Sequence, residues 1–369
     1  MRIAMLGTRG VPARYGGFET AAEEIGRRLV ERGHDVVVYC RNPGQVRTEY
    51  LGMRLVNLPA VRHRTAETLS HTMLSVGHAI TRERPDVAFL FNAANAPLLP
   101  AVRVARIPVA VHVDGLEWKR AKWGRRASGY YRWAEARSAR WADAIIADAE
   151  VIADHLHDAY GVAAHCISYG AAIVSPSPDG LAALHVTPGR YHLVVARLEP
   201  ENQVREIVAG YVDSKAQLPL LVVGDAPYAD EYRACVRAVA AGDPRVRFLG
   251  SVWDSELLDT LYAHAASYLH GHSVGGTNPS LLRALGAGAP VSAYDVVFNR
   301  EVAGAAGVYF STPADVAELC EAVEADPESA TARGAAGQAD AAIRYRWSDV
   351  ASAYEALAFE LVSTRRARR

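Results

Sequence analysis

Short apolar runs alternate with longer amphipathic runs along almost the whole chain of 369 residues. The apolar runs have the length of strands that are buried on both faces, and the longer runs place apolar residues at helical spacing. This alternation predicts an α/β fold with helices on both faces of a parallel sheet. In the first half, the expected strands are 2–8, 35–40, 54–61, 86–91, 108–113, 144–147 and 164–169, and the expected helices are 18–32, 66–81, 126–142 and 150–160.

A cluster of proline, serine and glycine between Ser175 and Gly180 interrupts the alternation near the middle of the chain. Such a cluster is typical of a linker between domains. Beyond it the pattern restarts, with strands expected at 192–196, 218–223, 246–249, 266–269, 290–293 and 307–310. We therefore predict two Rossmann-like domains in tandem, 1–175 and 176–345, with a ligand cleft between the carboxyl ends of their sheets. A closing helix within 346–369 is expected to pack back on the first domain.

Composition excludes several classes of protein. Half of the residues are hydrophobic and the net charge is −1, which indicates a soluble globular protein rather than a disordered one. No apolar run approaches the roughly 20 residues of a membrane span, and the amino terminus has the pattern of a strand and its loop rather than of a signal peptide. The four cysteines lack metal-ligand spacing, so reduced thiols in a cytoplasmic protein are expected.

The stretch from His270 to Val291 combines a strand end, a glycine-rich loop and the start of a helix. Gly275 and Gly276 let the backbone approach a ligand closely, and Asn278-Pro279 opens a helix whose first turn offers backbone N–H groups. The helix dipole favours negative charge at that end. The stretch is therefore predicted to bind a diphosphate, with an ordinary strand-to-helix turn as the alternative.

Four stretches in fixed order carry a resemblance to a known family: 6–20 (LGTRGVPARYGGFET), 114–120 (DGLEWKR), 196–202 (ARLEPEN) and 275–282 (GGTNPSLL). They resemble the bacterial rhamnosyltransferase-type branch of the family 4 glycosyltransferases, whose two Rossmann-like domains form the arrangement called GT-B. The resemblance implies a retaining hexosyltransferase that uses a nucleotide-sugar donor without a metal ion or other cofactor. It also implies a saccharide acceptor, usually lipid-linked, at the cytoplasmic face of the membrane. The donor we expect is dTDP-L-rhamnose, in the synthesis of cell-surface polysaccharide.

The resemblance also assigns roles to individual residues. Arg197 matches the family's phosphate-binding arginine, and its fork of donors suits phosphate oxygens. One of Glu199 and Glu201 is expected to bind the sugar or orient Arg197, while the other is exposed. Asp114 is expected either to take the acceptor proton or, where the donor phosphate is the base, to position the acceptor. The expected catalytic residues are Asp114, Lys119, Arg197 and Glu201, and the expected donor-binding residues are Gly16, Gly17, His112, Glu199, Asn202, Gly224, Leu249, His272, Gly275, Gly276, Thr277, Asn278, Ser280, Leu281 and Arg283.

Two positions depart from the wider family. Asn202 stands where many members have a lysine, and we expect Lys119 to supply the missing positive charge to the leaving diphosphate. Arg283 stands where they have a glutamate that accepts the ribose hydroxyls, and a guanidinium offers only donors. The donor site should then be indifferent to the ribose 2′-hydroxyl, which suits a deoxythymidine nucleotide. In the alternative, Arg283 points to a surface carboxylate and another group meets the ribose. For His112, a contact with the donor sugar and a structural role both stay open.

Basic and aromatic residues interleave from Trp118 to Trp141. Rings and cationic heads together suit the headgroup region of an anionic membrane, so peripheral association is expected; the alternative is a helix that buries its rings against the sheet. Residues 1–175 hold 23 Lys and Arg against 17 Asp and Glu, which agrees with an anionic surface or substrate, or with a solvated face. Nucleic acid is not expected as a partner, because the pI is near neutral and no known binding module is recognisable.

A catalytically silent relative, which binds a nucleotide sugar or partners another transferase, is the main alternative function. Retention of Asp114, Lys119, Arg197 and the whole loop 275–280 favours the enzyme, because a silent copy has no reason to keep all of them. A nicotinamide dehydrogenase would need a G-x-G-x-x-G turn after the first strand, and residues 7–10 (GTRG) do not supply it.

Overall fold

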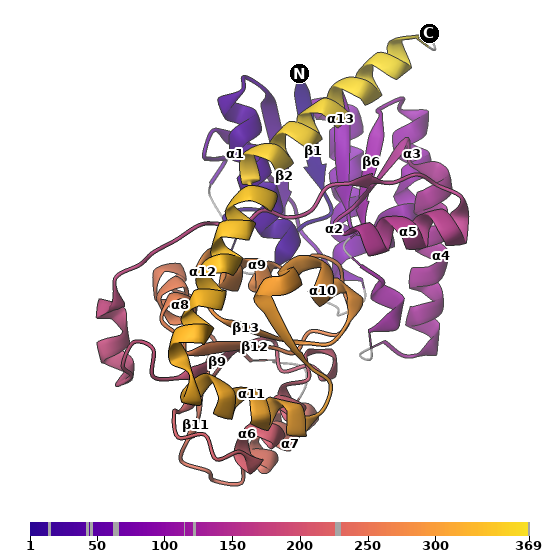
Figure 1. Cartoon of the computed structure of the whole chain (residues 1–369). Helices are drawn as coiled ribbons and strands as arrows, with labels where there is room; N and C mark the ends of the chain where they lie inside the picture. Colours follow the sequence, from indigo (N-terminus) through magenta and orange to yellow (C-terminus); the bar gives the residue numbers. More distant parts are fainter. Residues whose placement is uncertain are drawn as a thin grey trace. The chain divides into compact units, whose positions relative to one another are not determined.

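The computed structural model describes residues 1–13, 16–41, 44, 47–61, 66–113, 115–120, 123–225 and 230–367. The chain divides into two compact units, which Figure 1 shows coloured along the sequence. Unit 1 comprises Met1–Lys119, Trp123–Tyr169 and Trp347–Arg369, and unit 2 comprises Arg120–Lys122 and Gly170–Arg346. The sequence placed the boundary after residue 175, whereas unit 2 already includes the chain from Gly170.

Unit 1 contains an eight-stranded sheet in the order β3-β4-β2-β1-β5-β6-β7-β8. Neighbouring strands are parallel except β3 and β4, which form an antiparallel pair at one edge. Every residue of β5 and β6 is buried, as expected of strands that are covered on both faces. The strands are β1 (Arg2–Leu6), β2 (Asp35–Cys40), β3 (Glu49–Tyr50), β4 (Met53–Asn57), β5 (Val87–Phe91), β6 (Val109–Val113), β7 (Ala144–Ala147) and β8 (His165–Cys166).

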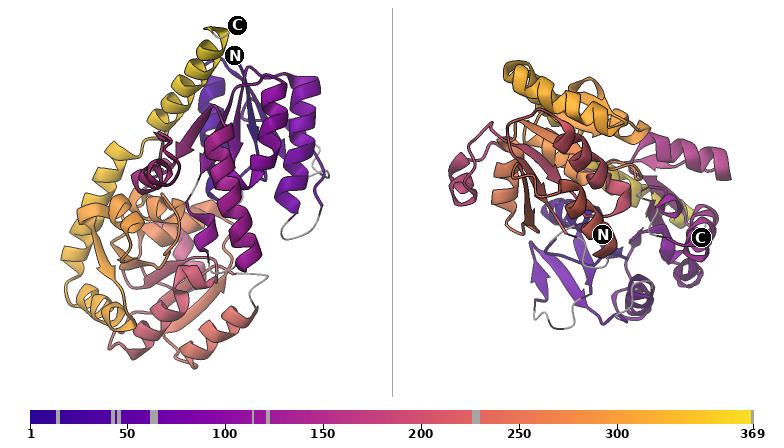
Figure 2. Two further views of the ribbon diagram at one scale, coloured as in Figure 1. Left: turned by 90° about the vertical axis from the view of Figure 1, so that its right-hand side faces the viewer. Right: turned by 90° about the horizontal axis from the view of Figure 1, so that it is seen from below.

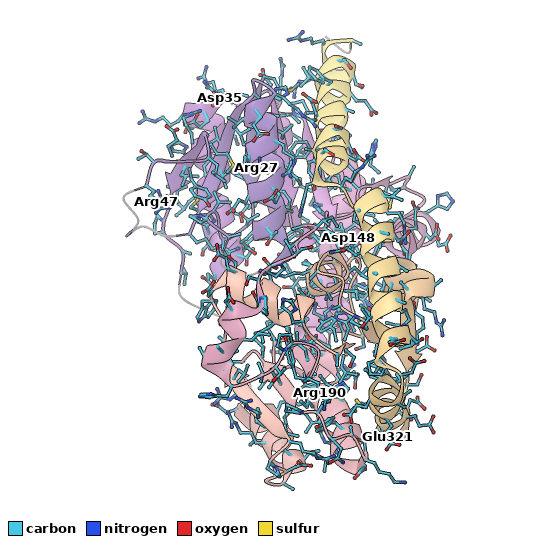
Figure 3. The ribbon with its side chains drawn as sticks, turned by 60° about the vertical axis from the view of Figure 1, so that its left-hand side comes forward. Arg27, Asp35, Arg47, Asp148, Arg190 and Glu321 are labelled. Atoms are coloured by element: carbon cyan, nitrogen blue, oxygen red, sulfur yellow. The ribbon has the colours of Figure 1, made fainter. Side chains whose placement is uncertain are left out.

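Helices cover both faces of the unit 1 sheet (Figure 2). They are α1 (Gly17–Glu31), α2 (Glu67–His78), α3 (Leu99–Val104), α4 (Arg125–Trp141), α5 (Glu150–Tyr160) and α13 (Trp347–Ala367). The last of them packs along α1, where Glu355 of α13 pairs with Arg32 at 2.9 Å and with His34 at 2.7 Å. Asp35, which Figure 3 labels, lies at the start of β2. It pairs with Arg2 at 2.6 Å and with Arg54 at 3.3 Å. These ion pairs hold the first strands and the last helix of the chain in one unit.

Several expected elements of unit 1 differ in extent from the structure. The strand expected at 164–169 is only His165–Cys166, and the one expected at 54–61 ends at Asn57. The helix expected to end at 81 stops at His78 and continues as a π-helical turn, Ala79–Glu83. The sequence did not predict β3, nor the 3₁₀ helix Ala93–Leu98 that leads into α3.

Unit 2 contains a six-stranded parallel sheet in the order β11-β10-β9-β12-β13-β14. Its core lies between the central strands and α6, where Val194, Val222 and Val208 are almost fully buried. Gly210 lets α6 approach the first residue of α11 closely, because a Cβ there would lie 2.1 Å from the Pro313 carbonyl oxygen. The strands are β9 (His192–Val195), β10 (Leu220–Val223), β11 (Val246–Gly250), β12 (Ser267–His270), β13 (Val291–Tyr294) and β14 (Gly307–Phe310). The helices are α6 (Val204–Asp213), α7 (Asp230–Ala240), α8 (Ser255–Ala263), α9 (Pro279–Gly286), α10 (Val297–Ala303), α11 (Pro313–Ala325) and α12 (Pro327–Arg344).

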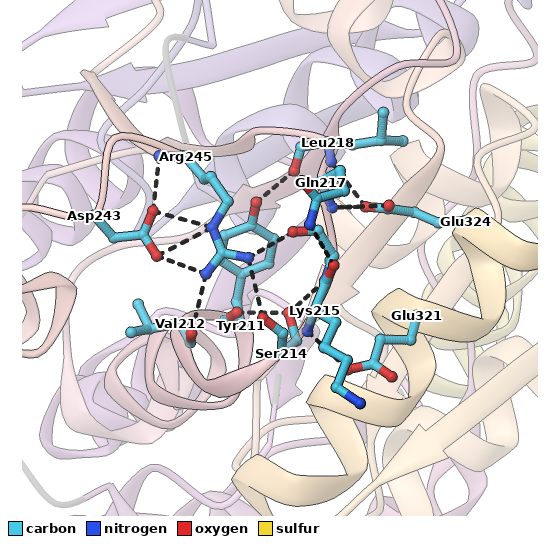
Figure 4. A network of polar contacts seen from close by, with 11 residues as sticks. Tyr211, Val212, Ser214, Lys215, Gln217, Leu218, Asp243, Arg245, Glu321 and Glu324 are labelled. Carbon is cyan, nitrogen blue, oxygen red and sulfur yellow. Dashed lines mark hydrogen bonds and ion pairs between the residues drawn. The ribbon is translucent and has the colours of Figure 1, made fainter.

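A polar network ties the loop between α6 and β10 to its neighbours (Figure 4). The Arg245 guanidinium pairs with Asp243 at 2.6 Å. It also donates to the carbonyl oxygens of Val212, in the last turn of α6, and of Ser214 and Ala216, which follow that helix. Glu324 of α11 accepts from the backbone N–H groups of Gln217 and Leu218 at 2.8 Å. It also meets His192, a fully buried residue, at 3.2 Å. The network therefore connects α6 and α11 to the end of the unit 2 sheet at which β9 and β10 begin.

Candidate functional site

All six strands of unit 2 end at one edge of the sheet, because they are parallel. This carboxyl edge brings together the residues that follow β9, β10, β11 and β12. Gly224 follows β10 with φ of 128°, and a Cβ there would lie 1.9 Å from the Ala196 carbonyl oxygen. Gly271 follows β12, and a Cβ there would lie 2.1 Å from the Asn202 carbonyl oxygen. Both positions require glycine for close backbone approach; Gly224 was expected at the site, and Gly271 was not.

Asn202 joins the loop after β9 to the loop after β12. Its amide nitrogen donates to the Arg197 carbonyl oxygen at 2.7 Å, and its Oδ1 lies 2.6 Å from His272 Nδ1. The residue is 5% exposed, so these bonds are shielded from water. Asn202 therefore acts as a brace between two loops, and it uses both a donor and an acceptor to do so. A lysine, which many members of the family have at this position, could only donate.

This brace also sets the protonation of His272. Because the Asn202 amide nitrogen is committed to a carbonyl, its oxygen faces the ring, and Nδ1 of His272 must donate. Burial lowers the pKa of His272 well below its usual range, and the positive charge of Arg197 acts in the same direction. The ring is thus a neutral imidazole, and its Nε2 lies close to the backbone of Gly275.

Arg197 emerges half-exposed at the end of β9, with 47% of its side chain accessible. One guanidinium nitrogen lies 3.4 Å from the Glu199 carboxylate, which is 18% accessible. Glu201 is buried at 3% exposure, and its carbonyl oxygen accepts from both the backbone N–H and the hydroxyl of Ser273 at 2.9 Å. The structure therefore brings Arg197 and Glu199 together at the carboxyl edge, while Glu201 contributes its backbone to the same pair of loops.

The predicted helix start at Asn278-Pro279 is confirmed, since α9 begins at Pro279 with Asn278 as its N-cap. The Asn278 side chain accepts from Ser280 twice, from its N–H at 2.9 Å and from its hydroxyl at 2.7 Å. Thr277 is 4% exposed and the Leu281 side chain is fully buried, so Leu281 has only its backbone to offer a ligand. Gly275 and Gly276 are buried in the loop that precedes the cap.

A buried support lies beneath this loop, and the sequence did not indicate it. The Tyr268 hydroxyl contacts His270 Nδ1 at 2.9 Å and the Ser280 hydroxyl at 3.3 Å. Burial raises the pKa of Tyr268 to about 12 and lowers that of His270 to about 3, so both are neutral near pH 7. From α10, Asn299 donates to the carbonyl oxygens of His272 and Tyr294 at 2.9 and 2.8 Å. The sequence signal that could have indicated this support is the polar character of β12, in which Ser267, Tyr268 and His270 accompany a single aliphatic residue.

Two other expected donor contacts lie on neighbouring elements of unit 2. The Arg283 guanidinium is bound to α8, with 2.6 Å between Nε and the Asp259 carboxylate and 2.7 Å to the Ser255 carbonyl oxygen. This is the arrangement of the alternative in which Arg283 points to a carboxylate. Leu249 is half-buried near the end of β11, beside Gly250, whose carbonyl oxygen accepts from the Gly224 N–H.

In unit 1, the loop after β1 is fastened to the first turn of α1. Gly16 caps this helix with φ of 108°, and a Cβ there would lie 2.2 Å from the Glu19 carboxylate. That carboxylate accepts from the Arg9 N–H at 2.8 Å. Gly16 therefore has a backbone reason for being glycine, and Gly17 is the first residue of the helix.

Two more expected residues of unit 1 that the structure describes lie in β6 and in the 3₁₀ turn after it, Glu117–Lys119. His112 is 1% exposed and is enclosed by rings, and its Nδ1 lies 2.6 Å from the Tyr354 hydroxyl of α13. Burial lowers its pKa to about 3. Lys119 is exposed, with its Nζ 5.3 Å from the centroid of the Trp118 ring. Asp114 lies outside the residues that the structure describes.

Within the described ranges, no group of three or more His, Cys, Asp or Glu side chains is arranged to hold a metal ion. Among the helices of the same ranges, none combines the length and the apolar character needed to cross a membrane.

Family models match a segment in each half of the chain. A family model described as "Glycosyl transferase 4-like domain" matches residues 16–170, and one described as "Glycosyl transferases group 1" matches residues 189–325. The O-antigen chain mannosyltransferase B of Escherichia coli is 28% identical over 156 residues. That alignment spans 40% of this chain and 40% of the relative's length.

Comparison with solved structures agrees on the fold. Sucrose-phosphate synthase from Thermosynechococcus elongatus superposes with a TM-score of 0.83 and 20% identity, over 98% of this chain and 99% of that one. HepE (Alr3699) of Anabaena, solved in complex with UDP-glucose, gives 0.79 and 17% over 97% and 99%. At these identities the likeness establishes the architecture: the two α/β units form the GT-B fold.

Proposed function

Because the chain joins a glycosyl transferase 4-like domain to a glycosyl transferases group 1 domain and so belongs to the GT-B glycosyltransferases, we propose that it transfers a hexosyl group from a nucleotide sugar to a saccharide. The observation that carries the proposal is the braced carboxyl edge of unit 2. There Arg197, Asn202 and His272 link the loop after β9 to the loop that opens α9. The solved relative HepE holds UDP-glucose, which supports a nucleotide-sugar donor.

The chemistry of donor cleavage explains why such an edge is needed. Breaking the bond between sugar and diphosphate places an additional negative charge on the leaving group, which preorganised donors stabilise. Arg197 offers a guanidinium at one side, and the start of α9 offers backbone N–H groups and the positive end of a helix dipole. Because His272 is neutral, it contributes no positive charge of its own to this stabilisation. We infer that the transfer proceeds with retention and needs no metal ion, with charge stabilisation supplied by these groups.

For the donor we propose dTDP-L-rhamnose. Arg283 supplies no acceptor for ribose hydroxyls, and its guanidinium is occupied by Asp259 and Ser255. With no acceptor at position 283, this position gives the site no basis for rejecting a deoxyribose. The Escherichia coli relative is named as a mannosyltransferase, so a mannosyl donor is the competing choice.

A donor panel tests both the activity and the choice of donor. Melting temperatures measured with dTDP-, UDP- and GDP-sugars should rise most with dTDP-L-rhamnose, because a ligand that binds the folded state stabilises it by mass action. Mass spectrometry of a saccharide acceptor incubated with the stabilising donor should then show one added hexosyl residue. A GDP-sugar as the stabilising donor would replace the rhamnosyl assignment. Binding without transfer to any saccharide acceptor tested would instead favour the catalytically silent alternative.

For the acceptor we propose a lipid-linked saccharide in cell-surface polysaccharide synthesis, used at the cytoplasmic face of an anionic membrane. Support comes from α4, where Trp133 is 40% exposed and Arg137 lies 5.9 Å from its ring centroid and 5.4 Å from that of Trp141. Exposed rings beside guanidinium groups suit the headgroup region. Arg132 belongs to another contact, because it stacks on Trp118 at 4.3 Å.

A further inference from the structure

The amino edge of the unit 1 sheet, where its strands begin, carries a concentration of positive charge. Because β5, β6 and β7 are neighbours in the sheet, the helix ends that precede them meet at this edge. Five exposed arginines lie there, and none of them has an ion-pair partner among the described residues: Arg82, Arg84, Arg103, Arg106 and Arg140. The facing carboxylates are engaged elsewhere, Glu83 with Arg54 at 2.7 Å, and Asp86 and Asp143 with backbone N–H groups. The edge therefore presents uncompensated guanidinium groups.

A cavity of about 380 Å³ opens between two of these arginines. Arg84 and Arg106 line it, together with Ile80, Pro85, Ala105 and Ile107. Pro85 and Ile107 are buried, so the cavity has an apolar base and a rim that carries two positive charges. Such a space accommodates an anionic group whose remainder is apolar.

Both arginines occupy a backbone position that favours glycine. Arg84 has φ of 47° at the end of the π-helical turn, and Arg106 has φ of 58° shortly after α3. Left-handed residues at helix ends are usually glycine, since a side chain there is strained. The chain nevertheless has arginine at this position before β5 and again before β6. This repetition indicates that the arginine side chain itself has a function.

Exposed apolar groups continue the same surface. Val104 is 84% exposed, between Arg103 and Ala105. The Arg103 guanidinium donates to the Trp141 carbonyl oxygen at 3.4 Å, which connects the end of α3 to the end of α4. The rings of Trp141 and Trp133 thus extend a surface that already combines cationic and apolar groups.

We propose that this amino-edge patch, defined as Arg82, Arg84, Arg103, Val104, Arg106 and Arg140, docks the protein on an anionic phospholipid surface, with a headgroup phosphate between Arg84 and Arg106. The proposal deepens the membrane part of the proposed function by assigning its contact face. Guanidinium groups that form no ion pair with the described residues match the lipid phosphates, and Val104 and the tryptophan rings match the apolar level just beneath them.

Vesicle co-sedimentation tests the assignment. The wild-type chain should bind vesicles of phosphatidylcholine with phosphatidylglycerol more strongly than vesicles of phosphatidylcholine alone. The double variant Arg84→Glu with Arg106→Glu should lose at least about tenfold in apparent affinity for the anionic vesicles. The matched control, Arg190→Glu with Arg205→Glu, changes the net charge equally on the exposed surface of unit 2 and should bind as the wild type does. Val104→Asp should weaken binding without altering any arginine.

The outcomes separate the patch from the enzymatic proposal. An equal loss in the test and control pairs, or no loss in either, overturns the patch, as does binding that persists in Val104→Asp at wild-type strength. Vesicle binding by none of the proteins, with capture of an acidic protein instead, overturns it too. Nucleotide-sugar binding, measured by calorimetry on the same proteins, should be unchanged by the patch variants. Failure of the wild type to bind any donor would refute the proposed function while leaving the vesicle result to stand.

Discussion

At the level of single residues, the site depends on where guanidinium groups find partners. Arg197 keeps most of its donors available, because Glu199 meets one nitrogen at 3.4 Å and nearly half of the side chain is accessible. Arg283 is instead fixed between Asp259 and Ser255. Two arginines near one sheet edge thus have opposite states, one open to a ligand and one committed to the protein.

The open state of Arg197 leads to the first prediction. Arg197→Lys keeps the charge but loses the fork of donors, so kcat/KM for the best donor should fall by about 100-fold or more. Donor affinity should fall less, since the lost contact acts mainly on the charge that develops during cleavage. Steady-state kinetics with calorimetry would measure both, with Arg205→Lys as the matched control. An unchanged kcat/KM would remove Arg197 from the catalytic set.

The contacts that hold Arg283 lead to the second prediction. A glutamate at this position should provide an acceptor for the ribose hydroxyls and tighten UDP more than dTDP. Because Arg283→Glu alone would place two carboxylates beside each other, the substitution belongs in an Asp259→Asn background, with Asp259→Asn alone as the control. Calorimetric titration of both nucleotides decides the matter, and an identical change for UDP and dTDP would contradict the argument.

At the level of elements, the contact between α11 and the start of the unit 2 sheet makes stability depend on pH. Burial raises the pKa of Glu324, but the bonds to His192, Gln217 and Leu218 outweigh it and lower the pKa from 4.5 to about 2. The ionised carboxylate therefore contributes stability that is complete above the unfolded value and is lost as pH falls through 4.5 towards 2.

The third prediction follows from this contact. Between pH 6 and pH 2, the wild type should lose about 2 to 3 kcal/mol of unfolding free energy that Glu324→Gln does not lose. Denaturant titrations at several pH values would show the two curves converging on the acid side. Parallel curves would mean that Glu324 contributes nothing that depends on its charge.

The bounds of several helices and strands could be predicted from the sequence. The bounds of β2, β7, α5 and β14 are those expected, because each is a short run set off by polar or turn residues. The region from Ala93 to Val104 was missed, since Pro97 and Pro100 argue against a helix although a 3₁₀ helix and α3 accommodate them. The cap of α9 was predicted because it depends on adjacent residues. The bond between Asn202 and His272 could not be predicted, because 70 residues separate them and only the fold brings them together.

At the level of the whole molecule, the proposed charge stabilisation comes from Arg197 and from the start of α9. The fourth prediction is that sugar transfer continues unchanged in EDTA and is not raised by magnesium or manganese, because these groups supply the positive charge that a metal ion otherwise provides. Product formation with and without chelator is the measurement. Transfer that stops in EDTA and returns with a divalent ion would refute metal independence.

The length of the strands in unit 1 sets the distance between the end of the sheet where they begin and the end where they finish. Five residues, as in β5 and β6, span about 17 Å. With the amino-edge patch on a bilayer, the loop that carries Gly16 and the turn that carries Lys119 stand off from the lipid by at least that distance. A sugar attached directly to a membrane anchor would be out of reach, whereas the free end of a longer glycan would not. The sheet would then act as a ruler, which selects the extension of chains already begun over the priming of new ones.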